Sequence, residues 1–252
     1  MIAVTSFSET GYHQYGKRFL EQAIVNWPSK IIVYYEAKPD LVHEKIEYRD
    51  LFGVSELRTF LFYLQDKPLT HGKLPDGQGL QTYDYNYDTW KFCRKSFVQF
   101  DVLKETEEKV FWLDADIEFK KPISEDFLES LFLETRGGKQ KPRTLTCLWR
   151  EGFHTETGFI GFDPKGLGFK EFLEEYMNVY RKGTLFTLPR WHDCAAFDHA
   201  VEKSGVLFKN LSKFYVKNKT PLDVMSLSVL EPYMDHMKGD RKYGVEKIYK
   251  GA

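Results

Sequence analysis

The sequence predicts an α/β fold in which one mixed, mostly parallel sheet is flanked by helices. Apolar, β-branched and aromatic runs at residues 2–7 and 30–36 are typical of buried strands. Between them, residues 13–28 show helical spacing of apolar side chains and stop at Pro28. Strand, helix and strand in this order form one βαβ unit, whose crossover is expected to be right-handed.

The rest of the chain continues this alternation, which is typical of an open α/β sheet. Helices are expected at residues 54–66, 89–108, 124–132, 168–183 and 193–205. Strands are expected at residues 109–114, 144–149, 157–164 and 206–212. Residues 67–88 are predicted to form a long surface loop that faces substrate, and residues 229–252 a tail with little periodicity.

Composition narrows the function classes. The chain has 252 residues, 42% of them hydrophobic and 29% charged, as in ordinary soluble globular proteins. A formal net charge of −1 gives no global basic field, so bulk attraction to nucleic acid or an anionic membrane is not indicated. The three cysteines lack CxxC spacing, which argues against a disulfide framework or a zinc site. With no signal-peptide pattern and no apolar segment of membrane-spanning length, we expect a cytoplasmic protein without a transmembrane segment.

Two carboxylates follow the most apolar strand, in the stretch "KVFWLDADIEF" at residues 109–119. On an extended backbone Asp114 and Asp116 would point to one spot while Ala115 turns aside. Oxygen ligands at this spacing suit a hard divalent cation, which would cancel their repulsion and could hold a diphosphate. The alternative is that the pair caps the next segment or is solvated.

A second group of polar residues lies in "HMKGDRKYG", where His236, Gly239 and Lys242 are spaced three apart. An imidazole can complete the shell of a first-row metal, which favours Mn²⁺ over Mg²⁺. Glycine lets the backbone approach a phosphate closely, and lysine supplies a point charge for it. The alternative is a solvated basic tail.

Together, "FWLDADIEF" and the distant "HMKGDRK" resemble the GT-A glycosyltransferases, especially the glycogenin-like and lipopolysaccharide galactosyltransferase-like retaining enzymes. The resemblance implies that Asp114, Asp116 and His236 ligate Mn²⁺, with Mg²⁺ as the other candidate ion. It also implies that Gly239 and Lys242 contact the diphosphate of a nucleotide sugar. The family usually has Pro and an aromatic residue after this Lys, whereas Tyr243 and Gly244 follow here.

The same resemblance assigns residues around the sugar. "HTETGFIGFD" is similar to the acceptor-side strand of the family, so that Glu156, Thr157 and Gly158 would face the sugar. In "RWHDCAAFDHAV", Asp193 matches one acid of a pair that opens a helix near the donor sugar, and His192 replaces its neighbour. Asp193 could also serve as a helix N-cap, which its position supports equally.

The nucleotide would lie near the end of the first strand. In the GT-A fold the loop corresponding to "TSFSETGY" holds base and ribose, and we expect contributions from Ser6, Ser8, Tyr12 and Glu36. Turn formation and capping are the alternative roles of these side chains. Ala115 belongs to the same donor-binding set. Lys95, with Lys91 one turn before it, would face phosphate unless the two form a solvated basic face.

The sequence therefore predicts one GT-A domain, with residues 1–118 binding the nucleotide sugar, 119–218 forming the acceptor side and 219–252 closing over the diphosphate. The expected reaction is Mn²⁺-dependent transfer of a sugar, from UDP-sugar as the commonest donor, with retention. An inverting mechanism with Glu156 or Asp193 as base, a nucleotidyltransferase and a non-catalytic nucleotide-sugar-binding module are the alternatives. The acceptor is left open among a glycan, a lipid-linked sugar, a protein and a modified nucleic-acid base.

Overall fold

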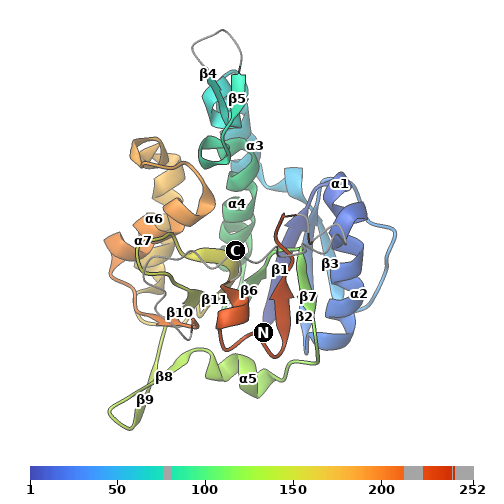
Figure 1. Ribbon diagram of the computed structural model, residues 1–252, viewed down its shortest axis with the longest axis vertical. Coiled ribbons are helices and arrows are strands. Elements are labelled where there is room, and N and C mark those ends of the chain that lie inside the picture. The colour runs from blue at the N-terminus through green and yellow to red at the C-terminus, as the bar shows by residue number, and fades with distance from the viewer. Residues whose placement is uncertain (76–80, 213–223, 240, 242–252) are drawn as a thin grey trace, which may run out of the picture.

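A seven-stranded sheet forms the centre of the molecule, with the strand order β12-β10-β11-β6-β1-β2-β3 (Figure 1). The computed structural model describes residues 1–75, 81–212, 224–239 and 241. The strands are β1 (Ile2–Phe7), β2 (Lys30–Tyr35), β3 (Ile46–Asp50), β6 (Val110–Leu113), β10 (Leu145–Leu148), β11 (Glu156–Phe162) and β12 (Phe208–Asn210). The predicted α/β class with a mixed, mostly parallel sheet is confirmed.

Among the described strands of this sheet, β11 alone is antiparallel to its neighbours. It pairs antiparallel with both β10 and β6, whereas β6, β1, β2 and β3 are parallel and β10 is parallel to β12. Because of this reversal, the beginning of β11 lies beside the carboxyl end of β6, where Phe159 pairs with Leu113. The backbone N–H of Asp114 then donates to the carbonyl of Gly158 at 2.9 Å. Two segments named by the sequence motifs thus meet at one edge of the sheet.

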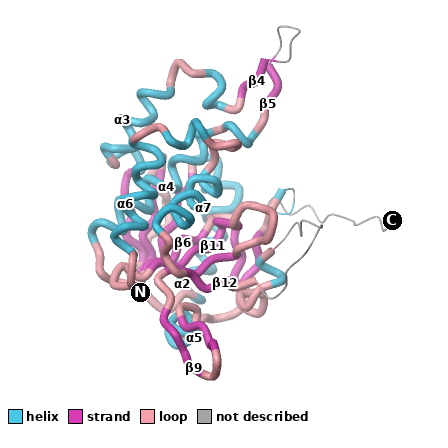
Figure 2. The backbone as a smooth tube through the Cα atoms, turned by 90° about the vertical axis from the view of Figure 1, so that its left-hand side faces the viewer, coloured by secondary structure: helices cyan, strands magenta, loops and turns pink. Residues whose placement is uncertain are grey.

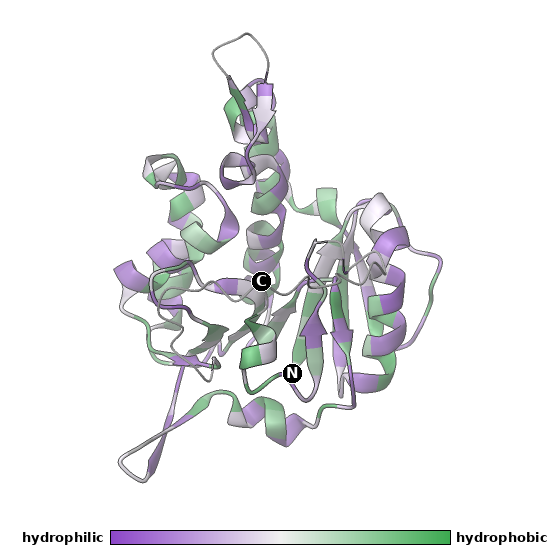
Figure 3. Ribbon diagram, in the orientation of Figure 1, coloured by the Kyte–Doolittle hydropathy of each residue, from purple (hydrophilic) through white to green (hydrophobic). Residues whose placement is uncertain are grey.

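Helices cover both faces of the sheet, and successive side chains along a strand point to opposite faces. One face packs against α2 (Lys17–Asn26) and α5 (Glu125–Ser130), whose ribbons combine hydrophobic and hydrophilic residues as expected for surface helices (Figure 3). The other face packs against four helices. These are α3 (Ser55–Leu64), α4 (Thr89–Glu105), α6 (Phe169–Arg181) and α7 (Asp193–Ser204). On β6, Trp112 faces this second layer while Phe111 faces the first, which is the period-2 alternation of a strand buried on both sides.

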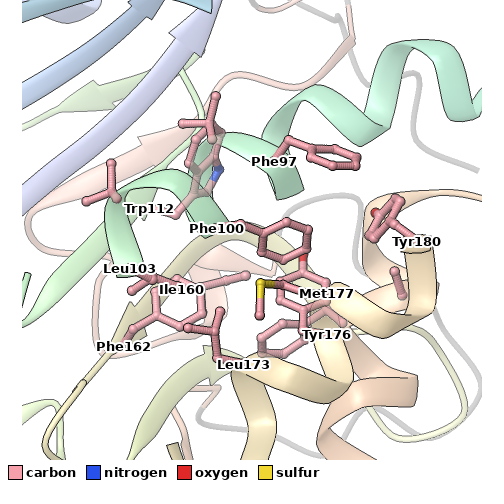
Figure 4. Packing of buried hydrophobic residues seen from close by; sticks show 14 of the residues in the cluster. Phe97, Phe100, Leu103, Trp112, Ile160, Phe162, Leu173, Tyr176, Met177 and Tyr180 are labelled. Atoms are coloured by element: carbon pink, nitrogen blue, oxygen red, sulfur yellow. The ribbon is translucent and has the colours of Figure 1, made fainter. Parts of the chain in front are cut away.

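Buried aromatic rings hold α4 in place across the second face. Phe100 of α4 meets Tyr176 of α6 edge to face, with ring centroids 4.8 Å apart (Figure 4). The hydroxyl of Ser96 forms hydrogen bonds with the hydroxyls of Tyr176 and Tyr180, at 3.0 and 2.7 Å. This packing satisfies the buried hydroxyls and fixes the neighbouring Lys95, which enters the candidate site.

A small two-stranded ribbon lies outside the main sheet. Its strands, β7 (Ile117–Phe119) and β13 (Met234–His236), pair antiparallel, with His236 opposite Ile117 (Figure 1). Strand β13 falls in the tail that showed little periodicity in the sequence. Three residues are too few for a period-2 pattern, and its partner is distant in the chain, so local sequence provides no signal for this strand.

Two exposed hairpins extend from the body at opposite ends (Figures 1 and 2). Strands β4 (Lys73–Pro75) and β5 (Gln81–Tyr83) form one of them, inside the segment predicted as a loop. Strands β8 (Leu133–Arg136) and β9 (Lys139–Pro142) form the other, between a predicted helix and a predicted strand. No helix among the described residues combines the length and the apolar character needed to cross a bilayer.

Candidate active site

A cavity of about 270 Å³ opens at the carboxyl ends of β1, β2 and β6. Ligands of open α/β sheets gather at this edge, near the point where strand order reverses, and here β1 lies between β2 and β6. Its polar lining includes Ser6 and Ser8 after β1, Glu36 after β2, Lys91, Arg94 and Lys95 from α4, and Asp114 and Asp116 after β6. The structure therefore brings most of the predicted donor-side residues to one hollow.

The Asp pair lies in a tight turn. Strand β6 ends at Leu113, and the carbonyl of Asp114 accepts a hydrogen bond from the N–H of Ile117 at 3.1 Å. The expected extended backbone at the Asp pair is wrong, because the chain turns here to begin β7. The two carboxylates nevertheless approach one atom, Nε2 of His236. Ala115, at the middle of the turn, is buried and lines the cavity.

His236 joins the two carboxylates. Its Nε2 lies 2.9 Å from Oδ1 of Asp116 and 3.7 Å from Oδ2 of Asp114, and the imidazole is buried. Burial alone would lower the pKa of His236, but the hydrogen bond with Asp116 and the charges of Asp116, Glu156 and Asp114 outweigh burial and raise it. His236 of the tail motif therefore lies against Asp114 and Asp116, although it is distant from them in the chain.

Gly158 provides the room for this imidazole. A Cβ added to Gly158 would lie 2.5 Å from Cε1 and 2.7 Å from Nδ1 of His236, closer than carbon atoms pack. The predicted acceptor-side glycine therefore contacts the candidate metal ligand. This close packing of an imidazole on a glycine is a tertiary contact, which the local sequence does not indicate.

Glu156 begins β11 and belongs to the same cluster. Its Oε1 lies 3.6 Å from Nδ1 of His236, and its Oε2 accepts from the ammonium of Lys238. Burial raises the pKa of Glu156, but the charges of Lys238 and His236 exceed this effect, so the pKa is lowered. One ligand atom each from Asp114, Glu156 and His236 lies within 4.8 Å of the others, which is compact enough for one ion. Sequence reasoning placed Glu156 beside the sugar and missed Lys238.

Asp193 and Asp114 share one lysine. The ammonium of Lys95 lies 2.8 Å from Oδ1 of Asp114 and 2.9 Å from Oδ2 of Asp193, and it donates to Thr157 at 3.1 Å. The Thr157 hydroxyl also donates to Asp193 at 2.6 Å. Burial disfavours the charged ammonium, but the two carboxylates hold the pKa of Lys95 well above its ordinary value. The alternative of a solvated face is wrong for Lys95, since its side chain is only 14% exposed.

The helix cap beside this group is His192. Its Nδ1 accepts from the N–H of Ala195 at 3.3 Å, and Asp193 is the first residue of α7. The alternative of Asp193 as N-cap is therefore wrong, and its carboxylate is available to Lys95 and Thr157. Burial lowers the pKa of His192, so that the imidazole favours its neutral form, which can accept the capping hydrogen bond.

Tyr12 differs from the other donor-side candidates. It is buried in the π-helical turn Tyr12–Gly16 before α2, and its hydroxyl donates to Asp40. Tyr15 lines the cavity in this region instead. Both tyrosines carry the same functional group, so only the backbone path through this turn decides which one reaches the cavity.

Part of the predicted diphosphate clamp can be located. Gly239 has a φ of +61°, a left-handed backbone conformation that glycine adopts without strain. Lys242, the other residue assigned to the diphosphate, lies outside the described residues. Of the residues 219–252 that are predicted to close over the diphosphate, the structure describes residues 224–239 and 241.

The side chains of this cluster suit a divalent metal. Three carboxylates and one imidazole suit an ion that accepts oxygen and nitrogen ligands, such as Mn²⁺. Among the described residues, the buried Nδ1 of His236 has no hydrogen-bond partner, which leaves one polar atom that a ligand could satisfy. A second group, His192, Asp193 and Cys194, is also compact, but Nδ1 of His192 accepts the capping hydrogen bond of α7. Burial also raises the pKa of the Cys194 thiol, which disfavours the thiolate that binds metal.

Comparisons with known proteins identify the fold. No protein-family model matches the chain, and no curated protein matches it in sequence. Mouse xyloside xylosyltransferase 1 in its apo form is similar in structure, with a TM-score of 0.51, 10% identity, and coverage of 84% of this chain and 86% of that chain. An active-site mutant of LgtC gives a TM-score of 0.45 at 10% identity, covering 95% and 88%. The glycosyltransferase GlyE of Streptococcus pneumoniae TIGR4 gives 0.45 at 14%, and the chain spans only 44% of its length.

The similarity to the xylosyltransferase confirms the expected resemblance to GT-A glycosyltransferases at the level of the fold. The sequence identities are too low to transfer substrates or catalytic residues.

Proposed function

We propose that this protein is a metal-dependent glycosyltransferase that moves a sugar from a UDP-sugar to an acceptor hydroxyl with retention of configuration. The observation that carries the proposal is the meeting of Asp114, Asp116 and His236 at the carboxyl end of β6, beside the 270 Å³ cavity. In a GT-A fold this edge is where a nucleotide sugar would bind.

Asp114, Asp116 and His236 would hold the metal. A divalent ion bound there would neutralise negative charge on the departing diphosphate. Around it, this chain contributes fixed charges: Lys95 on α4 is immobilised by Asp114, Asp193 and Thr157. Preorganised charges of this kind stabilise developing charge without reorganising during the reaction.

The cavity beside the cluster would bind the nucleotide. Ser6 and Ser8 provide hydroxyls, and Glu36 provides a carboxylate that could accept from base or ribose. The guanidinium of Arg94, which also lines the cavity, lies 3.4 Å from a carboxylate oxygen of Glu36. Lys91, exposed and one helical turn before Lys95, is the candidate cation for a phosphate.

Asp193 and Glu156 are poorly suited to act as a general base, which supports retention over inversion. Lys95 and the Thr157 hydroxyl outweigh burial and lower the pKa of Asp193, and Glu156 is likewise paired with Lys238. A carboxylate with a lowered pKa accepts a proton weakly. We assign Asp193 instead to hydrogen bonding with, or charge stabilisation of, the donor sugar.

Release of UDP from UDP-sugars, assayed with and without Mn²⁺, tests the proposal. We expect Mn²⁺-dependent release of UDP together with free or transferred sugar, and its loss in the Asp116→Asn and His236→Ala variants. Asp66→Asn, at an exposed position away from the cavity, is the matched control and should retain activity. Binding of UDP-sugar without turnover would support a binding module, and exchange of pyrophosphate with nucleotide would support a nucleotidyltransferase.

A further inference from the structure

Glu156 and Lys238 form an ion pair inside the candidate metal cluster. The Glu156 side chain is only 10% exposed, and its Oε2 accepts from the Lys238 ammonium. Its other oxygen, Oε1, faces His236 at 3.6 Å and accepts from the N–H of Gly158 at 3.2 Å. One oxygen of the carboxylate therefore lies near the imidazole, within ion-pair distance, and the other is bonded to a lysine.

The two lysines of the site are held differently. Lys95 lies on the rigid helix α4, is 14% exposed and is bound by two carboxylates and Thr157. Lys238 follows the short strand β13, and its side chain is 33% exposed. Among the described residues, it pairs with the carboxylate of Glu156. Lys238 can therefore leave its partner without disturbing the sheet, whereas Lys95 cannot.

Charge explains why a cation is needed beside Glu156. A buried carboxylate without a partner costs several kcal/mol, so one of its neighbours must neutralise it. Asp114 has Lys95, and Asp116 has the His236 imidazole. The ammonium of a lysine is a compact point charge on a flexible stem, which can occupy or vacate a carboxylate by rotation of its side chain.

We propose that Glu156 is an additional ligand of the divalent metal and that Lys238 is an internal counter-ion which the metal displaces. This inference rests on the proposed metal-dependent function and extends it to two residues outside the Asp-x-Asp and His motif. Metal binding then becomes an exchange in which the ion replaces the Lys238 ammonium at Oε2. Lys238 weakens metal binding, and Glu156 strengthens it.

Titration of Mn²⁺ followed by electron paramagnetic resonance of the free ion, without nucleotide, measures this exchange directly. Replacing a competing charge at close range should change affinity by about tenfold, so Lys238→Met is expected to bind Mn²⁺ about tenfold more tightly than the unmodified chain. Glu156→Gln should bind about tenfold more weakly. Lys120→Met is the matched control, because Lys120 also pairs with a glutamate, Glu231, at 3.2 Å beside the same β7–β13 ribbon. It should leave Mn²⁺ affinity unchanged.

The double variant separates displacement from a general effect of charge. With Gln at position 156 there is no ion pair to break, so adding Lys238→Met should no longer tighten Mn²⁺ binding. If Lys238→Met binds Mn²⁺ as the unmodified chain does, or more weakly, the counter-ion role is wrong while the proposed function stands. Unchanged affinity in Glu156→Gln removes Glu156 as a ligand. Absence of Mn²⁺ binding in both the unmodified chain and Lys238→Met overturns the metal dependence and this inference together.

Discussion

Nε2 of His236 lies 2.9 Å from Oδ1 of Asp116, although 120 positions separate the two residues in the chain. The contact exists because β13 pairs with β7, the strand that begins directly after the Asp pair. It joins the two motifs on which the proposed function depends.

Gly158→Ala should displace the His236 imidazole. The added Cβ would lie 2.5 Å from Cε1 of His236, and the ring must shift from its present position beside Asp116 to relieve the overlap. Loss of a positioning contact around a metal ligand typically costs about 10- to 100-fold in metal affinity, and we expect a loss of this size for Mn²⁺. Electron paramagnetic resonance of free Mn²⁺ measures it.

Gly53→Ala is the control for this substitution. The nearest atom to its added Cβ is 3.6 Å away, an ordinary van der Waals distance, and Mn²⁺ affinity should not change. Equal Mn²⁺ affinity in Gly158→Ala and the unmodified chain would contradict the proposed role of His236.

Lys95→Met should strongly destabilise the fold. It leaves Asp114 and the buried Asp193 without their shared cation, and removal of one partner from a buried ion pair typically costs about 3–5 kcal/mol. Urea unfolding followed by circular dichroism measures the free energy of unfolding. Lys91→Met, one turn earlier and exposed on the same helix, should change it by less than about 0.5 kcal/mol. Similar losses in both variants would show that the Lys95 pairs contribute nothing specific.

The ion pair of Asp193 should make stability depend on pH. Burial raises its pKa, but Lys95 and Thr157 hold it below the 3.8 of an ordinary Asp. A carboxyl with a lowered pKa in the folded state stabilises the protein above its unfolded pKa, and this contribution is lost as pH falls through the folded value. The unmodified chain should therefore exceed Asp193→Asn in free energy of unfolding at pH 7, and the difference should shrink below about pH 4. Urea unfolding at several pH values measures this, and a difference that grows on acidification would reverse the assigned sign.

The cavity lining predicts which N-terminal residues bind nucleotide. Glu36→Gln should weaken UDP binding by about tenfold, since a hydrogen bond to a charged group contributes about 1.5–3 kcal/mol. Tyr12→Phe removes a hydroxyl bonded to Asp40 and should lower stability without changing UDP affinity. Isothermal titration calorimetry with UDP and Mn²⁺ measures both. Weaker binding in Tyr12→Phe with unchanged binding in Glu36→Gln would place the nucleotide elsewhere.

Local sequence predicted the long elements well. The apolar runs of β1, β2 and β6 and the helices α3, α4, α6 and α7 carry strong periodicity, because each buries a continuous stripe or face. The edge strand β3, whose five residues are all at least partly exposed, carries no such signal and was not predicted. The hairpins β4–β5 and β8–β9 were also not predicted, because their strands are mostly exposed and carry no apolar pattern.

The sequence by itself determined the fold class, the two motifs and the residue types that could hold a metal, because these depend on periodicity and on chemistry that neighbouring residues carry. Tertiary structure alone decided how the motifs meet. The Asp pair sits in a turn, Glu156 enters the cluster through the reversed strand β11, and Lys95 and Lys238 supply its cations. These contacts join residues distant along the chain, and their geometry is fixed by strand pairing and helix packing, which no local pattern encodes.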